Sequence, residues 1–332
     1  MSTKQWVAAV LAFMFLAPAA YADDQTVTIQ MVKSTGQSPF YIAMGKGYFT
    51  QENIKIDVGN VRSALDAIGP MATGKLDAAM GAATAGFFNA AHQGFDLRIA
   101  AAMGLQGKLM ATQPLARKEL WDNGTIKSAK DLKGRKVAIN APGDITEYFL
   151  SKMLDKYGIG MKEVEQTQMD FALQLVAFKS GAIDAGFLPE PLATTAKNQG
   201  VAALIQPESS IGEGVPTTFL FLATQFMHDR PKVAEAFMRA LIRGARDAQG
   251  AYNKDPAIAA MIAQQTGLKI EDVEDSAPYL FDRNLDISKY EAKLRDEEAT
   301  DRKNGRLNYT EPLAFDKVLD ASLVHKAAAE VK

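Results

Sequence analysis

Hydrophobic and polar positions alternate along this chain in blocks that predict strands and helices taking turns. Residues 27–32 have the alternation of a strand, residues 40–46 have helical spacing, and residues 54–58 are again typical of a strand. A further helix is expected to run to about Thr73 and to end at Gly74. This order of elements is the pattern of a parallel sheet with crossover helices.

Two short segments, 107 positions apart, repeat the same order of residues. Gly74 to Met80 and Gly181 to Phe187 each place a turn glycine before an apolar residue, an aspartate and a small apolar run. The order predicts a helix that ends at the glycine and a short buried strand, and small or polar residues then begin a new helix. Ligands of open α/β sheets bind where strand ends meet helix N-termini. We therefore expect two similar lobes that face one cleft.

The second lobe is expected to lie between two extended apolar segments, residues 109–116 and 217–224, which we expect to pair as the hinge. Between them the pattern restarts, with strands predicted at 136–140, 165–169, 183–187 and 202–205. After residue 224 only helices are predicted, so this tail is expected to wrap the first lobe. The predicted boundaries are residues 1–22 for a leader, 23–112 with 217–332 for lobe 1, and 113–216 for lobe 2.

The first 22 residues have the features of a cleavable secretory signal peptide. Lys4 supplies the positive charge, residues 6–16 are apolar, and Ala20-Tyr21-Ala22 forms an A-x-A cleavage site. We expect a mature chain that begins at Asp23 and resides in the periplasm. The 332 residues are 47% hydrophobic and 23% charged, which suits two cores rather than one. The formal charge of -2 does not favour binding to nucleic acid or to a membrane surface.

Several kinds of chemistry are disfavoured by what the chain lacks. It has no cysteine, which removes disulfides, thiolate nucleophiles and cysteine metal sites. Its 3 histidines are far apart, and G-x-S-x-G and H-E-x-x-H motifs are missing. Residues 69–76 resemble a phosphate-binding loop but precede a predicted strand instead of following one. We expect no cofactor, no bound metal and no catalysis.

Candidate ligand-binding residues lie at the predicted strand ends and helix starts. They are Gln37, Ser38, Phe40, Arg62, Ala83, Thr84, Asp144, Ile145, Thr146, Asp170 and Glu190. Glu190 lies between two prolines, where its carboxylate would bind a ligand amine or hydroxyl, or else stabilise the first turn of a helix. Asp170 is expected chiefly as a helix N-cap, with a ligand contact as the alternative. Asp77 and Asp184 are expected to bind backbone of the preceding turn rather than ligand.

Four aromatic residues also lie near these ends: Phe40, Phe87, Tyr148 and Phe171. Each is expected mainly in packing, but as a set they suit an aromatic or hydrophobic ligand moiety. Arg62 is unusual because the helix dipole disfavours a cation at a helix start. It either points to solvent or pairs with an acid such as Asp57 or Asp66, or it binds a sulfonate or carboxylate in a bidentate manner.

Five parts of the chain carry a family resemblance: residues 38–43 with 47–49, 74–77, 131–138, 181–185 and 190–191. In them the chain resembles periplasmic substrate-binding proteins of ABC transporters with the type II fold. The branch includes nitrate-, taurine- and aliphatic-sulfonate-binding proteins and thiamine-precursor binders. The resemblance implies an α/β fold of two lobes, each a mixed, mainly parallel sheet flanked by helices, joined by a two-stranded hinge.

The same resemblance implies a function. A small organic anion, a sulfonate or carboxylate that can be aromatic, would be captured between the lobes and delivered by a monomer to an ABC permease at the inner membrane. The alternative is a neutral pyrimidine-type thiamine precursor. An enzyme on the same fold is less favoured, because the two enzymatic relatives rely on cysteines or a cysteine-rich motif that this chain lacks.

Overall fold

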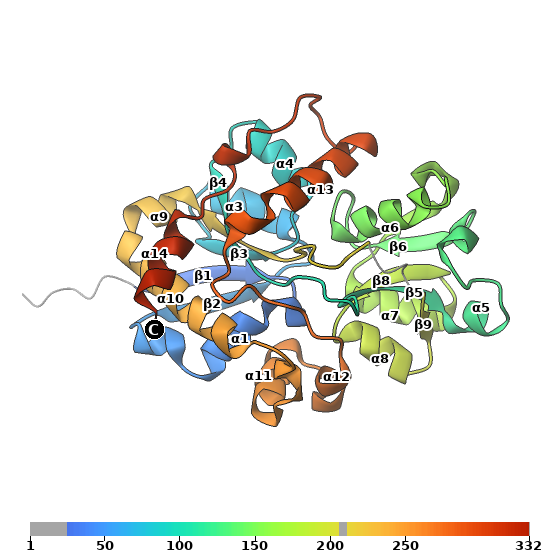
Figure 1. Cartoon of the computed structure of the whole chain (residues 1–332), viewed down its shortest axis with the longest axis horizontal. Coiled ribbons are helices and arrows are strands. Elements are labelled where there is room, and N and C mark those ends of the chain that lie inside the picture. The colour runs from blue at the N-terminus through green and yellow to red at the C-terminus, as the bar shows by residue number, and fades with distance from the viewer. Residues whose placement is uncertain (1–24, 206–210, 332) are drawn as a thin grey trace, which may run out of the picture.

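The computed structural model describes residues 25–205 and 211–331, so the predicted signal peptide and its cleavage site lie outside the described residues. Two lobes lie side by side, and each is built on a five-stranded sheet covered by helices (Figure 1). The strand orders are β2-β1-β3-β10-β4 in the first lobe and β7-β6-β8-β5-β9 in the second. The expected α/β fold of two lobes with mixed sheets is therefore confirmed.

The first sheet consists of β1 (Thr26–Met31), β2 (Lys55–Asn60), β3 (Ala78–Gly81), β4 (Leu97–Ala102) and β10 (Phe219–Ala223). The second consists of β5 (Thr112–Arg117), β6 (Lys136–Ile139), β7 (Glu165–Gln168), β8 (Ala185–Pro189) and β9 (Ala202–Leu204). In each sheet the fourth strand, β10 or β5, is antiparallel to both of its neighbours. This reversed strand is the one that enters from the other lobe.

The helices of the first half are α1 (Ser38–Gly45), α2 (Tyr48–Gln51), α3 (Ile68–Ala72), α4 (Ala85–His92), α5 (Lys118–Asp122), α6 (Ile145–Asp155), α7 (Phe171–Ser180) and α8 (Leu192–Asn198). Those of the second half are α9 (Thr224–Asp229), α10 (Pro231–Asp247), α11 (Pro256–Thr266), α12 (Ile270–Asp275), α13 (Glu291–Lys303) and α14 (Ser322–Glu330). Short 3-10 turns complete the chain: η1 (Thr35–Gln37), η2 (Ala64–Ala67), η3 (Ala129–Leu132), η4 (Met161–Glu163), η5 (Tyr252–Lys254), η6 (Ile287–Tyr290) and η7 (Phe315–Lys317).

The repeated sequence segment forms the same structure in both lobes. Gly74 and Gly181 both adopt the left-handed conformation that ends a helix, with φ of 68° and 75°. The aspartate that follows binds the backbone of the neighbouring strand: Asp77 accepts from the Thr28 N–H at 2.8 Å, and Asp184 accepts from the Lys136 N–H at 3.2 Å. The expectation that these aspartates bind backbone is confirmed, although the backbone belongs to the adjacent strand rather than to the preceding turn.

The predicted pairing of residues 109–116 with 217–224 is wrong. Strand β5 pairs with β8 and β9, and β10 pairs with β3 and β4, because such apolar runs are stabilised inside sheets. The start of the second segment instead pairs with residues that precede the first one: the Met103 N–H donates to the Thr218 carbonyl and the Thr217 N–H donates to the Gly104 carbonyl, both at 2.8 Å. Leu105 bridges both Pro216 and Leu280, so a third segment from the tail joins the two at the crossing.

The C-terminal tail reaches further than expected. Helix α10 packs on α1, but α12 also contacts α8, and α13 contacts α6, so the tail touches both lobes. The close contact of α10 with α1 depends on Gly244, since a Cβ there would lie 2.0 Å from the Pro39 carbonyl oxygen. The tail therefore packs on the first lobe, as expected, and in addition contacts the second lobe through helices α12 and α13.

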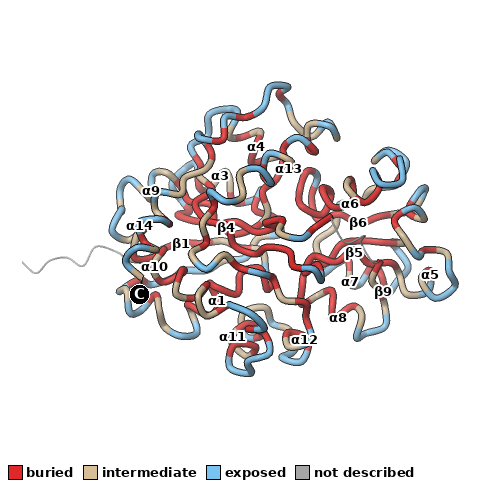
Figure 2. Tube along the Cα trace, viewed as in Figure 1, coloured by how far each residue is buried: buried red, intermediate tan, exposed pale blue. Residues whose placement is uncertain are grey.

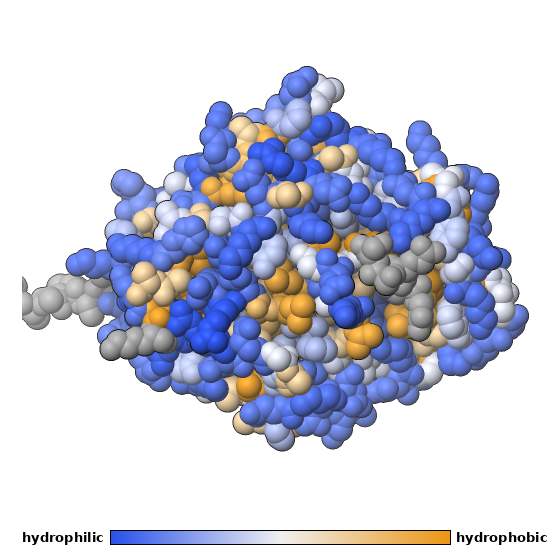
Figure 3. Space-filling model, viewed as in Figure 1, coloured by the Kyte–Doolittle hydropathy of each residue, from blue (hydrophilic) through white to orange (hydrophobic). Residues whose placement is uncertain are grey.

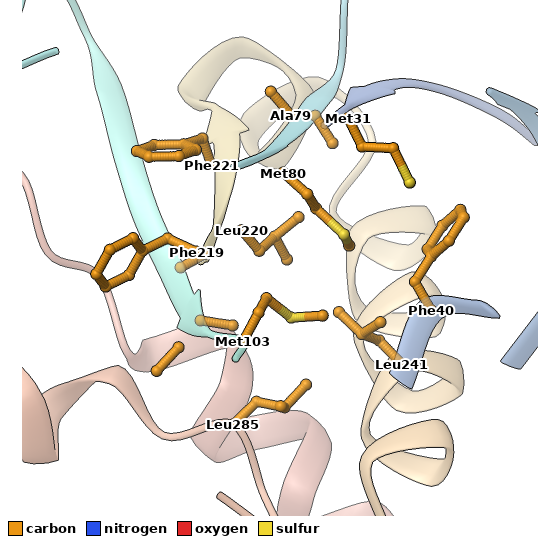
Figure 4. Packing of buried hydrophobic residues seen from close by; sticks show 14 of the residues in the cluster. Met31, Phe40, Ala79, Met80, Met103, Phe219, Leu220, Phe221, Leu241 and Leu285 are labelled. Carbon is orange, nitrogen blue, oxygen red and sulfur yellow. The ribbon is translucent and has the colours of Figure 1, made fainter. Parts of the chain in front are cut away.

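The cores follow the two sheets, and the buried trace runs through the strands and the inner faces of the helices (Figure 2). In the first lobe Met31 and Met80, on neighbouring strands, point toward Phe40 and Leu241 of the covering helices (Figure 4). The face seen in Figure 3 is mostly hydrophilic with small apolar groups. Within residues 25–205 and 211–331, no helix has the length and apolar character needed to cross a membrane.

Candidate functional site

A cavity lies between the lobes, where the carboxyl ends of β1, β3, β6 and β8 meet the crossing segments. It contains about 440 Å³ of empty space, its open mouth included. The residues that line it come from both lobes and from the tail: Val32, Ser34, Gln37, Ser63, Ala64, Gly81, Ala82, Thr112, Asn140, Asp144, Ile145, Phe171, Pro189, Thr217, Thr218 and Tyr279. This is the position at which open α/β sheets bind ligands.

Gln37 ends the turn η1 and belongs to the first-lobe wall of the cavity. The turn forms because the Ser34 hydroxyl accepts from the Gly36 N–H at 3.1 Å. The same hydroxyl donates to Gln37 Oε1 at 2.6 Å, which fixes the amide. Gln37 Nε2 is buried and has no hydrogen-bond partner among the described residues. An unpaired buried donor costs free energy unless a ligand or water accepts from it.

Asn140 follows β6 directly and belongs to the second-lobe wall. Its Nδ2 donates to the Arg62 carbonyl at 3.3 Å, a hydrogen bond between the lobes. Its Oδ1 is buried without a partner among the described residues. Asn140 and Gln37 therefore give the cavity one free acceptor and one free donor.

Asp144 is the only acidic residue among the described residues that line the cavity. It is the N-cap of α6, and its Oδ1 accepts from the Thr146 N–H at 3.0 Å and the Thr146 hydroxyl at 2.5 Å. Burial raises the pKa of Asp144 to about 6 against the opposing effect of these hydrogen bonds. No lysine, arginine or histidine is found among the described lining residues.

The floor of the cavity consists of hydroxyl groups from the crossing segments. The Tyr279 hydroxyl lies 3.0 Å from Thr112 Oγ1, and Thr218 Oγ1 accepts from the Gly104 N–H at 2.6 Å. Burial raises the pKa of Tyr279, so its hydroxyl remains protonated. A Cβ on Gly104 would lie 2.9 Å from the Gly36 Cα, so the crossing segment at Gly104 and the turn η1 are in direct backbone contact.

Direct hydrogen bonds between the lobes show that the cleft is closed. The Thr35 N–H donates to the Glu190 carbonyl at 3.0 Å, and the Ala85 N–H donates to the Gly143 carbonyl at 2.7 Å. These bonds lie on two different parts of the interface. A ligand in the cavity would therefore be enclosed by both lobes.

The Glu190 side chain binds protein groups instead of facing the cavity. It is fully buried, precedes the cis bond to Pro191, and accepts from Gln113 Nε2 at 2.7 Å and from the Thr194 N–H at 2.9 Å. It also accepts from the Ala277 N–H, at 3.2 Å, and thereby ties the tail to the second lobe. Burial raises the pKa of Glu190, opposed by Lys197 and by these hydrogen bonds. Of the two roles expected for Glu190, the structure favours the structural one.

Three of the predicted site residues, Gln37, Asp144 and Ile145, line the cavity. Ala83, Thr84 and Thr146 lie next to it; Thr84 caps α4, and Thr146 is bonded to Asp144. Ser38 and Phe40 are not among the lining residues, and both are fully buried. As ligand contacts, all of these assignments stay predictions.

Some expected roles differ in the structure. Ser38, a candidate ligand contact, is the first residue of α1, and its hydroxyl donates to the Thr35 carbonyl at 2.7 Å. Asp170 occupies the N-cap position of α7 without a side-chain cap bond and does not line the cavity. The Arg62 side chain is 67% exposed and lies 3.7 Å from Asp66.

Of the four aromatic residues, only Phe171 lines the cavity. Phe40 and Phe87 pack in the first core, and the Tyr148 hydroxyl donates to Asp296 at 2.7 Å. The sequence offered a signal for Asn140, a polar residue that directly follows a strand, but it was not among the candidates. No local pattern marks Thr112, Thr217, Thr218 or Tyr279, whose place depends on how the crossing segments meet.

Within residues 25–205 and 211–331, no group of three or more histidine, aspartate or glutamate side chains is arranged to hold a metal ion. The cavity offers both hydrogen-bond donors and hydrogen-bond acceptors. Amide, hydroxyl and carboxyl groups surround a space whose apolar walls include Val32, Ile145 and Phe171. Such a site can bind and orient a small molecule.

Comparison with known proteins agrees with this description. The family model described as NMT1/THI5 like matches residues 34–253. No curated protein matches the sequence.

Among solved structures, the alkanesulfonate-binding protein SsuA from Xanthomonas axonopodis pv. citri, bound to MOPS, has 18% identity and a TM-score of 0.69, over 89% of this chain and 99% of that one. The periplasmic nitrate-binding protein NrtA from Synechocystis PCC 6803 has 16% identity and a TM-score of 0.79, over 93% and 90%. The desulfurization enzyme DSZB has 14% identity and a TM-score of 0.62, over 92% and 99%. These structures share the two-lobed fold.

Proposed function

The chain belongs to the NMT1/THI5-like family, and from this premise we propose that it is a solute-binding protein that captures a small neutral nitrogen heterocycle of the aminopyrimidine kind. The ligand would be held between the lobes and delivered to an ABC permease. Export to the periplasm by the predicted signal peptide is part of the proposal. The fold shared with the alkanesulfonate-binding and nitrate-binding proteins supports a binding role.

The observation that carries the choice of ligand is the polarity of the cavity. With respect to the described part of the chain, Gln37 Nε2 is a donor without a partner and Asn140 Oδ1 is an acceptor without one, and Asp144 adds a carboxyl group. An aminopyrimidine has ring nitrogens that accept and an amino group that donates, so it satisfies both kinds of partner. Phe171 and Ile145 supply apolar contacts for the faces of a ring.

The competing ligand is the organic anion, a sulfonate or carboxylate, that the family resemblance implies. A sulfonate only accepts hydrogen bonds and carries a full negative charge. Enclosed beside Asp144, and with no cationic side chain among the described lining residues, it would be a charge buried without a partner. Helix N-termini and hydroxyls alone would have to compensate. The neutral ring is therefore favoured.

No catalytic step is proposed, although a desulfurization enzyme is among the similar structures. The chain has no cysteine to act as a nucleophile.

The ligand class is tested by thermal unfolding and titration calorimetry with matched probes. The neutral probe is the aminopyrimidine half of thiamine, with its hydroxymethyl and methyl substituents. The anionic probes are methanesulfonate, benzoate and nitrate. A probe at ~100 times its dissociation constant adds ~2.7 kcal/mol of stability. We expect stabilisation by the pyrimidine alone. Stabilisation by an anion and not by the pyrimidine would contradict the proposed ligand class.

Two variants test the residues. Gln37→Glu replaces the free donor by an acceptor, and Asn140→Asp adds a charge, so each is expected to weaken pyrimidine binding about ten- to a hundredfold. The matched control is Gln199→Glu, an exposed glutamine after α8. If both cavity variants bound the pyrimidine as tightly as the control does, neither amide would contact the ligand.

A further inference from the structure

A cluster of buried carboxyl groups lies between the lobes, beside the cavity. It forms where α6 of the second lobe meets α13 of the tail (Figure 1). Its members are nearly inaccessible to solvent, each being 4% exposed or less: Asp144, Glu147, Glu297, Glu298 and Asp301. So many carboxyl groups at one closed interface are costly if all of them are ionised.

The two sides of this cluster belong to different lobes. Helix α13 is anchored in the first lobe, because Leu294 is part of that core and the loop after the helix is held by Asn89 of α4, whose Nδ2 donates to the Arg306 carbonyl at 3.1 Å. Asp144 and Glu147 belong to α6, whose buried residues pack in the second core. Opening of the cleft would therefore separate Glu297 and Asp301 from Asp144 and Glu147.

The cationic partners are too few for the cluster. Arg306 forms an ion pair with Glu147 across the lobes, and Arg302 lies 2.8 Å from Glu298. Glu297 Oε1 is buried and has no hydrogen-bond partner among the described residues.

Other charged or titratable groups on the packed elements are mostly engaged elsewhere. Lys152 and Tyr148 of α6 bind Asp296, at 2.9 and 2.7 Å, and Lys303 binds Asp155 at 2.6 Å. On the α4 side, the His92 ring stacks on Tyr309 at 4.3 Å.

The surroundings favour protonated carboxyls in this closed form. Burial raises the pKa of Asp301 to about 8, and the charges of Glu147 and Asp144 add to this against Arg306. Burial also raises the pKa of Glu297 well above its ordinary value, and Asp301, Asp296 and Asp144 act in the same direction. A carboxyl group in water has a pKa of about 4. The closed form thus holds protons at neutral pH that solvated carboxyls would release.

We propose that the carboxyl cluster between α6 and α13 takes up protons as the lobes close, so that acidification favours the closed form and alkalinity favours the open one. The physical reason is that withdrawal of α6 returns Glu297 and Asp301 to water and removes two negative neighbours. The mechanism needs no particular ligand and is therefore independent of the proposed function. For each proton taken up, the ratio of closed to open protein changes about tenfold per pH unit.

The test measures the distance between the lobes in the ligand-free protein. Because the chain has no cysteine, spin labels can be placed at Lys55→Cys in β2 and Lys179→Cys in α7, both exposed positions. Electron–electron double resonance then gives the closed fraction at pH about 5.5 and about 8.5, on either side of neutrality. The same labels are used in Glu297→Gln with Asp301→Asn, in each single variant, and in the control Glu311→Gln, an exposed acid of the tail.

We expect the wild type and the control to open as the pH rises. The double variant carries neutral side chains of the same shape and is expected to stay closed at both pH values. A wild-type distance that does not change with pH, or a double variant as sensitive as the wild type, would overturn the proposal. Each single variant is expected to lose part of the pH dependence of the distance between the lobes. The single variants therefore test the proposal even if the double variant does not fold. Single variants that respond to pH as fully as the wild type would also contradict the proposal.

Discussion

The strongest structural prediction concerns Glu190, whose carboxylate holds together the second lobe and the tail. In Glu190→Gln one carboxylate oxygen becomes an NH2 group. If the remaining oxygen keeps the three donors that now reach Oε1, the new NH2 group faces the Thr194 N–H, which donates to Oε2 at 2.9 Å. Two donors then face each other in a fully buried site.

The magnitude follows from these contacts. One buried N–H without an acceptor costs about 1 to 3 kcal/mol. Lys197, whose Nζ lies 3.8 Å from Oε1 and whose side chain is 33% exposed, loses an ion pair worth at most about 1 kcal/mol. The free energy of unfolding is therefore expected to fall by about 1 to 4 kcal/mol in total.

Urea unfolding followed by circular dichroism at neutral pH measures this difference. The matched control is Asp170→Asn, an acid at the start of another helix of the same lobe that makes no side-chain cap bond. Its unfolding free energy is expected to stay within about 0.5 kcal/mol of the wild type. If Glu190→Gln were as stable as this control, the hydrogen bonds to Glu190 would not stabilise the fold, and its conformation would need a ligand-related explanation.

Three further predictions concern closure, charge and pH. Gly143→Ala is expected to hinder closure, because a Cβ at this glycine, with φ of 63°, would lie 2.3 Å from the Ala85 Cβ of the other lobe. The control is Gly134→Ala, which carries the same backbone strain, with φ of 70°, but has open space around the new Cβ. If small-angle scattering gave equal closed fractions for the two variants, the steric argument would be refuted. Arg62→Ala is expected to change pyrimidine affinity less than about threefold, because its side chain is 67% exposed; a loss of a hundredfold by calorimetry would restore the anion-binding hypothesis. Asp301, with a pKa raised from 3.8 to about 8, binds its proton more tightly in the folded protein. The stability contributed by this protonated carboxyl is complete below the pKa of the unfolded chain, 3.8, and is lost as the pH rises through about 8. The unfolding free energy measured between these two pH values should therefore fall as the pH rises, and it should fall less in Asp301→Asn.

Local sequence patterns determined most of the elements. The turn glycines Gly74 and Gly181 predicted helix ends because the left-handed conformation favours glycine. Asp144 was placed at the start of a helix, and in the structure its side chain caps backbone N–H groups there. The apolar runs predicted β5 and β10 as extended segments. All of these properties depend on neighbours within a few positions.

The partners of these elements were decided by the tertiary structure. Nothing local in residues 109–116 and 217–224 distinguishes pairing with each other from pairing inside the two sheets, because both arrangements bury the same apolar side chains. Only the assembled sheets provide strands on both sides of β5 and β10. The lobe boundaries proposed from the sequence stay a prediction.

The site shows the same division. The sequence indicated Gln37 and Asp144, which follow recognisable strand ends and turns. It could not indicate Tyr279 or Thr218, which reach the cavity from distant segments that share no motif with it. Whether Glu190 faces a ligand or binds Gln113 and Thr194 depends on which segments fold over it. Backbone conformation is set by short-range forces that a sequence displays, whereas the environment of a side chain is set by contacts between residues far apart in the chain.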